Sequence, residues 1–354
     1  MAIVQRLIYL ICISMLLSAC NSLSYYGQAI SGHLDLVSRE RAIDDLLKDQ
    51  NTPQTLKHKL SLALNARAFA TSQIGLPDND SYKTYADLGR PYAVWNVIAT
   101  PRYAIEAKKW CFLMVGCISY RGYFDKLQAQ ALADQLREAG MDVIISGAAA
   151  YSTLGWMDDP LLNTVVMRSD SSMVGIIFHE LAHQVVYVDG DSAFNEAFAT
   201  AVEYEGLRRW YTRQNNEQAY LQYRDKKNQQ QMIYQQLQLT RDRLDTVYKQ
   251  NIPDAEKQRQ KDQLFAGLKI WYQDWRKAHE YDGFDDWMNK ELNNAHLALI
   301  ATYQQMVPDF LFALQSVDGD MKKFFELVNV MAELDTTKRR ELLSTYKTRI
   351  QALN

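Results

Sequence analysis

Two histidines near the middle of the chain are spaced for metal chemistry. His179 and His183 stand four positions apart, and Glu180 directly follows the first of them. On an α-helix, positions i and i+4 lie on one face, so the two imidazoles converge on one point. This geometry suits tetrahedral Zn²⁺, which takes nitrogen ligands at about 2.0–2.1 Å. Glu180 is rotated by about 100° around the helix, where its carboxylate can accept a proton from water at the metal without binding the ion.

A third ligand follows in the next helical segment. A catalytic zinc site needs three protein ligands and one open position, and Glu196 can supply the third if its helix packs antiparallel to the first. A turn at 189–191 joins the two segments. Thr200 and Glu203 lie one and two turns beyond Glu196, and we expect them to hydrogen-bond to the free ring nitrogens of the histidines. Asn195 is expected to support the ligand beside it without touching the metal.

The surroundings of the motif favour a metal site over a helix with surface histidines. The chain has only six histidines, and a chance HExxH is expected in roughly one such chain in a hundred. Phe178, Leu181 and Ala182 make the motif apolar, and burying two unpaired histidines there is unfavourable. The predicted chemistry is amide hydrolysis, in which Glu180 takes a proton from the attacking water and passes it to the leaving amine.

The elements that must position these residues are mostly helices. The zinc motif lies in a continuous helical pattern that runs to Tyr187, with Ser171 or Ser172 as the N-cap. Two long helices are expected to meet at 251–253, where Pro253 suits the first turn of the second. The other expected elements are two helices over 34–72 broken at 51–53, irregular structure with short strands over 75–117, a helix over 122–139 capped by Gly140, buried strands at 142–146 and 164–168, and a loop or edge strand over 150–160.

The predicted fold class is α+β, mainly α, with a small sheet and a helical C-terminal half. The expected regions are a signal peptide at 1–19, a tether at 20–33, a catalytic region at 34–212, a long helical hairpin at 213–283, and a C-terminal helical region at 284–354 that completes the active-site cleft. The hairpin could protrude and is a candidate surface for a protein partner. Its mixed charges and the net charge of −3 for the chain argue against binding nucleic acid.

The N-terminus is typical of a lipoprotein signal. Arg6 is the only charge among the first twenty residues, and the apolar run over 7–17 is short for spanning a bilayer. It ends in Ser18-Ala19-Cys20, which resembles a bacterial lipobox and makes Cys20 the expected lipidation site. An ordinary signal peptide with a coincidental cysteine is the alternative. Because Asn21 follows the cysteine, the resemblance implies an outer-membrane lipoprotein that faces the periplasm.

Two cysteines remain after the signal. Cys111 and Cys117 are six positions apart, and in an exported protein they could close a small disulfide loop. A pair of free buried thiols is the alternative. Neither interpretation makes them catalytic.

The zinc motif resembles that of the gluzincin metallopeptidases. HELAHQ at 179–184 and FNEAFAT at 194–200 are similar to the motifs of the M1-like aminopeptidases, which carry HELAHQ and then LNEGFATYVEY. The resemblance implies a zincin-like core that holds one Zn²⁺ ion. In this chain the spacer between the two motifs is shorter, and the Gly-x-Met-Glu-Asn element that holds the substrate amine in that group is not found.

More of the chain resembles a family of bacterial lipoproteins known as predicted aminopeptidases. Besides the zinc motif, the matching segments lie within 110–124, 150–160 and 293–303. An oxyanion donor besides zinc is needed, and Tyr303, in the third segment, is the first candidate. Tyr151, in the second, is the next candidate. Either tyrosine could instead be a core aromatic residue.

The segment 150–160 also holds the candidates for binding the substrate. An aminopeptidase needs a carboxylate near the metal to hold the free ammonium, and Asp158 or Asp159 could supply it. Gly155 lies in the same loop and is assigned to substrate binding with them. Asp159 precedes Pro160, so turn chemistry explains it equally well.

Three functions remain open on the sequence alone. The first is an aminopeptidase that acts on peptides at the bacterial envelope, and the second is an endopeptidase that cuts envelope proteins with the same zinc chemistry. The third is a non-catalytic scaffold in which zinc is structural and the hairpin binds a protein partner. The presence of Glu180 favours an enzyme, because a purely structural zinc site needs no base.

Overall fold

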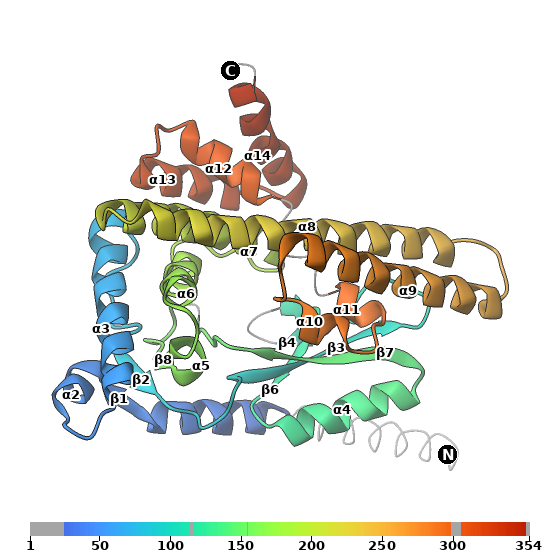
Figure 1. Cartoon of the computed structure of the whole chain (residues 1–354), viewed down its shortest axis with the longest axis horizontal. Helices are drawn as coiled ribbons and strands as arrows, with labels where there is room; N and C mark the ends of the chain where they lie inside the picture. The colour runs from blue at the N-terminus through green and yellow to red at the C-terminus, as the bar shows by residue number, and fades with distance from the viewer. Residues whose placement is uncertain (1–24, 113–115, 154, 299–305, 352–354) are drawn as a thin grey trace, which may run out of the picture.

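The computed structural model describes residues 25–112, 116–153, 155–298 and 306–351. These residues form a mainly helical structure with small sheets, as the sequence predicts (Figure 1). Cys20 and Tyr303 lie outside the described residues. Within those ranges, no helix combines the length and the apolar content that crossing a membrane requires.

The strands among the described residues are short and form three sheets. In the main sheet β3 (Val94–Pro101) lies between β6 (Arg121–Tyr123) and β7 (Met141–Ala148); a second sheet joins β1 (Glu40–Ala42), β2 (Thr84–Ala86) and β8 (Leu161–Leu162); and β4 (Trp110–Phe112) pairs with β5 (Gly116–Ile118). Successive side chains of β3 point to opposite faces of the main sheet. Val97 packs toward helix α4 (Lys126–Glu138), and Ile98 packs toward α11 (Asn294–Ala298) on the other face.

Helices build the largest core, which surrounds the histidine motif. Besides α4 and α11, the labelled helices of the structure are α2 (Ile43–Lys48), α3 (Gln54–Phe69) with the π-helical turn η1 (Ala70–Ile74), α5 (Asn163–Val166), α6 (Asp170–His183), α7 (Ser192–Arg213), α8 (Glu217–Tyr248), α9 (Asp254–His279), α10 (Asp285–Met288), α12 (Val307–Gln315), α13 (Met321–Ala332) and α14 (Thr336–Gln351). Buried side chains of α3, α6, α7, α12 and α13 form one apolar cluster. Phe178, Phe198 and Phe310 are fully buried at its centre.

The long hairpin of α8 and α9 lies across the molecule instead of protruding from it (Figure 1). Its apolar face packs on Ile105, Met288 and Leu292 in a second core. The buried ammonium of Lys261 on α9 pairs with Asp142 at the start of β7. The expectation of a protruding hairpin is therefore wrong, because both its apolar residues and a buried ion pair attach it to the sheet region.

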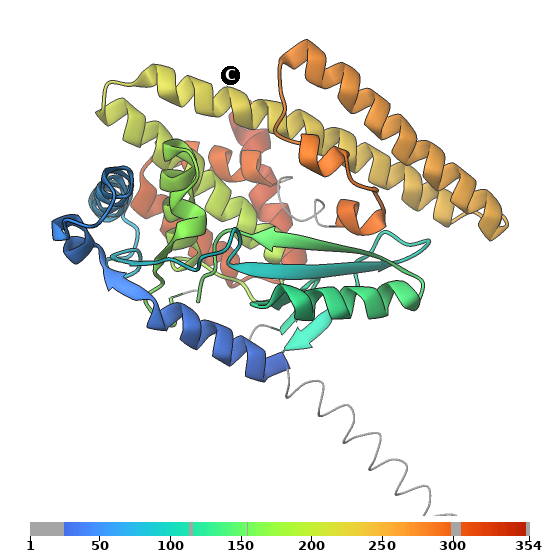
Figure 2. The ribbon, with the colours of Figure 1, turned by 60° about the horizontal axis from the view of Figure 1, so that its bottom comes forward.

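The segment expected to be a tether is largely helical. Residues 25–38 form a helix that runs below the sheet region (Figure 2). Tyr25 packs on the rings of Phe112 and Tyr123, and Gln28 accepts a hydrogen bond from the backbone of Phe124. These contacts fold the segment onto the sheet.

Several element boundaries differ from those expected. Residues 163–166 form the short helix α5 in place of a strand at 164–168, because only Leu161 and Leu162 pair with β2. Helix α4 begins at residue 126, capped by Asp125, because residues 121–123 are paired with β3. Helix α6 is capped by Ser169, whose hydroxyl accepts a bond from Ser172, and it ends at His183 rather than at Tyr187.

A buried ion pair ties the C-terminal helix to the start of α7. Asp191 caps α7 by accepting a hydrogen bond from the Phe194 backbone, and its other oxygen pairs with Arg339 of α14. Arg339 is 4% exposed, stacks over the Phe194 ring and also donates to the Met331 and Leu334 carbonyls. Each of the three nitrogens of this buried guanidinium therefore donates a hydrogen bond.

Removing this guanidinium should strongly destabilise the fold. We expect Arg339→Met to lower the free energy of unfolding by about 3–5 kcal/mol, because Asp191 is left as a buried charge without its partner. The neighbouring Arg340 is exposed and lies 3.8 Å from the same carboxylate, so Arg340→Met should cost at most about 1 kcal/mol. Urea denaturation measures both values. Equal destabilisation by the two variants would contradict the assignment.

Candidate active site

Two helices in close contact carry the histidine motif. His179, Glu180 and His183 lie on α6, and Glu196 lies in the second turn of α7. Glycines allow the two helices to approach: a Cβ atom on Gly206 would lie 2.7 Å from the Phe178 ring. A Cβ atom on Gly175 would lie 3.1 Å from Glu203. Any larger residue at Gly206 would push the helices apart and separate the side chains between them.

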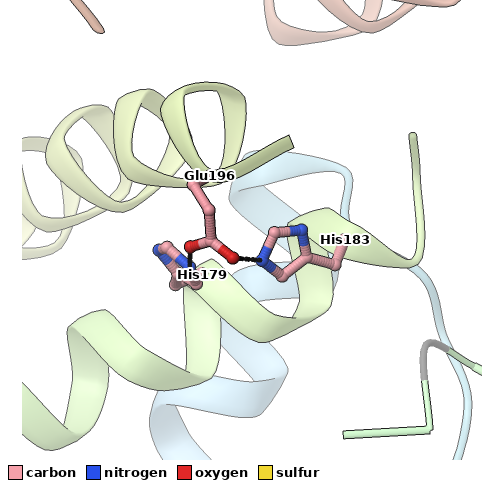
Figure 3. A group of neighbouring side chains, drawn as sticks. All are labelled: His179, His183 and Glu196. Atoms are coloured by element: carbon pink, nitrogen blue, oxygen red, sulfur yellow. Dashed lines mark hydrogen bonds and ion pairs between the residues drawn. The ribbon is translucent and has the colours of Figure 1, made fainter. Parts of the chain in front are cut away.

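The side chains of His179, His183 and Glu196 converge on one point. The Glu196 carboxylate lies between the two imidazoles, as Figure 3 shows. One of its oxygens is 3.3 Å from His179 Nε2, and the other is 3.8 Å from His183 Nε2. The three ligand atoms lie within 4.8 Å of one another.

These distances suit a tetrahedral zinc ion. Ligand atoms at about 2.0–2.1 Å from such an ion stand roughly 3.3–3.4 Å apart. The 3.3 Å from Glu196 to His179 Nε2 matches this separation, and the 3.8 Å from Glu196 to His183 Nε2 is somewhat longer. The Glu196 side chain is 28% exposed and that of His179 16% exposed, so the group is open to solvent on one side. Two nitrogens and one oxygen with an accessible side match the donor set of a catalytic zinc site.

The charges of the three groups are strongly coupled. Burial alone would lower the pKa of His179, but hydrogen bonds to Glu196 and Glu203 and the nearby Glu180 raise it to about 10. Burial and the positive charge on His179 lower the pKa of His183 to about 4. Burial favours the neutral form of Glu196, yet contacts with both histidines lower its pKa overall. The protein thus gathers negative charge that a proton on His179, or a metal cation, compensates.

Glu180 is placed beside this group and not within it. Its carboxylate is absent from the cluster of possible metal ligands among the described residues. Burial raises its pKa to about 7 against the opposing charge of His179, and the charges of Glu196, Asp159 and Glu203 add to the rise. A carboxylate with a pKa near neutrality can both accept and donate a proton.

The residues expected to support the ligands take different positions. Glu203 Oε2 lies 3.4 Å from His179 Nδ1. Thr200 is buried, but no hydrogen bond joins its hydroxyl to either histidine in the described part of the chain, and His183 Nδ1 has no partner there. Asn195 instead bonds the amide and carbonyl of Val188 and so holds the loop between α6 and α7.

The loop at 150–160 reaches the end of α6. Gly155, at φ +84°, lies where a Cβ atom would contact Gln184 at 3.4 Å. Asp159 is buried and accepts bonds from Ser152 and Thr153, so it organises the loop itself. Asp158 accepts a bond from the Asp80 backbone at an exposed turn. The carboxylates of both aspartates are therefore engaged within loops.

The tyrosines near the site differ from those expected. Tyr151 packs on the rings of His33 and Phe124 and belongs to a separate apolar cluster. Tyr120 is 36% exposed, and desolvation followed by the charge of Glu196 raises its pKa to about 12. Tyr187 packs on the His183 ring with centroids 6.2 Å apart.

Tyr120 follows a disulfide hairpin. Cys111 and Cys117 are bonded and join β4 to β5, which confirms the disulfide and excludes a pair of free thiols. Tyr120 lies in the family-like segment 110–124, a signal of the same kind that favoured Tyr303 and Tyr151, but only the folded chain brings it near Glu196.

Metal binding at this site should release a proton. Because the pKa of His179 is raised to about 10 in the absence of a metal, a cation must displace this proton at neutral pH. The apparent affinity should then rise with pH by up to about tenfold per unit between pH 7 and 9 and fall again on acidification. Calorimetric titration with zinc in buffers of different ionisation enthalpy counts the protons released. An affinity independent of pH would show that His179 is neutral before the metal binds.

The comparisons with known proteins identify one family. The model of the family described as "Putative aminopeptidase" matches residues 24–343 of the 354-residue chain. No curated protein and no solved structure matches it. The match includes both the helix that carries His179 and the helix that carries Glu196. The chain belongs to the "Putative aminopeptidase" family.

Proposed function

We propose that the protein is a zinc-dependent peptidase of the gluzincin type, with a zincin-like core. The observation that carries the proposal is the convergence of His179, His183 and Glu196, with Glu180 beside them at a pKa of about 7. The family name supports peptidase chemistry of the aminopeptidase kind. When bound, Zn²⁺ would polarise the substrate carbonyl and increase the acidity of water.

The residues of the chain supply the remaining chemistry. Glu180 accepts a proton from the attacking water and delivers it to the leaving amine. Tyr120 is our candidate donor to the oxyanion, because its raised pKa keeps the hydroxyl protonated near Glu196 and Glu180. Tyr303, outside the described residues, stays a second candidate. Glu203 orients His179 through Nδ1, which directs Nε2 toward the metal.

The N-terminal sequence supports a proposal about where this activity takes place. We propose lipidation at Cys20 and attachment to the outer membrane on its periplasmic side. The disulfide between Cys111 and Cys117 supports an exported protein, because such bonds persist in oxidising compartments.

An endopeptidase is the second candidate, and one observation favours it. Asp158 and Asp159, the expected anchors for a substrate ammonium, are both engaged in hydrogen bonds within loops. With these two aspartates engaged, neither is free to favour substrates with free N-termini.

Glu180→Gln should separate metal binding from catalysis. We expect zinc content to stay at one ion per chain while kcat falls by about 10²- to 10⁴-fold, because the amide cannot accept the proton. The same change at the exposed Glu217 serves as the control and should leave kcat unchanged. Peptide hydrolysis and metal analysis are measured on the same preparation. Full activity of Glu180→Gln would exclude this residue as the base.

Blocking the substrate amine should distinguish the two peptidase classes. For an aminopeptidase, N-acetylation should slow cleavage by roughly 10- to 100-fold, because a charged hydrogen bond worth about 1.5–3 kcal/mol is lost. Chelation should abolish cleavage of the free peptide, and added zinc should restore it. Equal rates for free and acetylated peptides would support the endopeptidase instead.

A further inference from the structure

The carboxylate of Glu203 is held at both oxygens. Oε2 lies 3.4 Å from His179 Nδ1. Oε1 accepts a 2.8 Å hydrogen bond from the Tyr223 hydroxyl and lies 3.0 Å from the ammonium of Lys227. Because the two donors occupy Oε1, the carboxylate plane is set and Oε2 is directed at the imidazole.

Both donors come from the long hairpin. Tyr223 and Lys227 stand four positions apart on α8, so they share one face of the helix. Tyr223 is 8% exposed. The ammonium of Lys227 lies 5.4 Å from the Tyr223 ring centroid and 5.6 Å from that of Tyr204 on α7. Contacts of this kind restrict the position of the ammonium as well as stabilising it.

The arrangement affects the ligand and not only the local packing. A histidine that binds a metal through Nε2 must carry its proton on Nδ1, and the acceptor at Nδ1 fixes both the tautomer and the ring orientation. Glu203 is buried, and without Tyr223 and Lys227 its Oε1 would lose both of these polar partners. A rotated carboxylate would orient His179 less well.

We propose that Tyr223 and Lys227 are positioning residues of the metal centre, so that the hairpin helix α8 holds His179 in its binding geometry through Glu203. This inference rests on the proposed metal site. It adds that helix α8, which lies outside the histidine motif, helps to position His179. Tyr223 and Lys227 both contact Glu203 and act on His179 through it.

Metal binding by single variants tests the proposal. We expect Lys227→Met and Tyr223→Phe each to weaken Zn²⁺ and Co²⁺ binding by roughly tenfold, within the 10- to 100-fold range of such outer contacts. The visible spectrum of the Co²⁺-loaded protein should change, because it reports ligand geometry. Lys227→Arg keeps the charge and should restore most of the affinity. Arg224→Met, which removes an exposed cation from the same helix, should change neither affinity nor spectrum.

A double variant separates positioning from general destabilisation. If Lys227 acts through Glu203, Lys227→Met should weaken binding by less than about twofold when added to Glu203→Gln, because residues in one network are not additive. Independent, multiplying effects of the two substitutions would overturn the proposal. Thermal melting of each metal-free variant shows whether it is folded at the temperature of the titration.

The outcomes distinguish this inference from the proposed function. If the natural protein binds neither ion, both fail. If it binds both ions while Lys227→Met and Tyr223→Phe bind them with unchanged affinity and spectrum, only the positioning role fails. If the variants lose affinity as expected but the natural protein cleaves no peptide, the positioning role holds and the peptidase assignment fails.

Discussion

The close packing of α6 against α7 is the constraint on which the candidate site depends. Gly206 and Gly175 remove the side chains that would keep the two helices apart. This leaves space for the Glu196 carboxylate between the imidazoles of His179 and His183. The helices are joined by only a short loop, which Asn195 ties at Val188. Side chains on two such helices keep their relative positions, so this candidate site would need little reorganisation to bind a metal ion.

Gathering three acidic side chains at one place has an electrostatic cost that the surrounding structure reduces. Glu180, Glu196 and Glu203 all lie near His179, and their mutual repulsion would favour protonation. Lys227 and the His179 contact lower the pKa of Glu203 to about 2 despite its burial. For Glu180 the opposing charge is that of His179, and burial raises its pKa to about 7. Because their neighbours differ, Glu180 on α6 and Glu203 on α7 have pKa values shifted in opposite directions.

Polar contacts of Arg67 hold the loop that reaches the end of α6. Arg67 is 3% exposed and donates to the carbonyls of Ser81, Pro77 and Asn79. Asn79 in turn donates to Gln184, directly after the last residue of α6. A buried guanidinium of this kind can fix an irregular loop, because its donors are planar and rigid. The end of α6 is therefore fixed by residues about a hundred positions earlier in the chain.

The sequence alone was enough to identify the HExxH motif, the ligand candidate Glu196 and the contact of Glu203 with His179. Each depends on spacing along a helix, and such spacing is a local property that the chain carries into any fold. It also predicted the mainly helical class and the meeting of α8 and α9 near Pro253. Helix ends were predicted less well, because strand pairing at 121–123 and side-chain caps such as Ser169 decide them.

Only the tertiary structure brought distant residues close to the candidate site. Tyr120, Tyr223 and Lys227 come from other elements, and no periodic pattern relates them to the histidines. The attachment of the hairpin, the helical form of residues 25–38 and the use of Asp158 and Asp159 within loops were likewise set by packing. Contacts between remote segments depend on which apolar faces of helices and strands pack against one another. Local spacing along the sequence does not determine this packing.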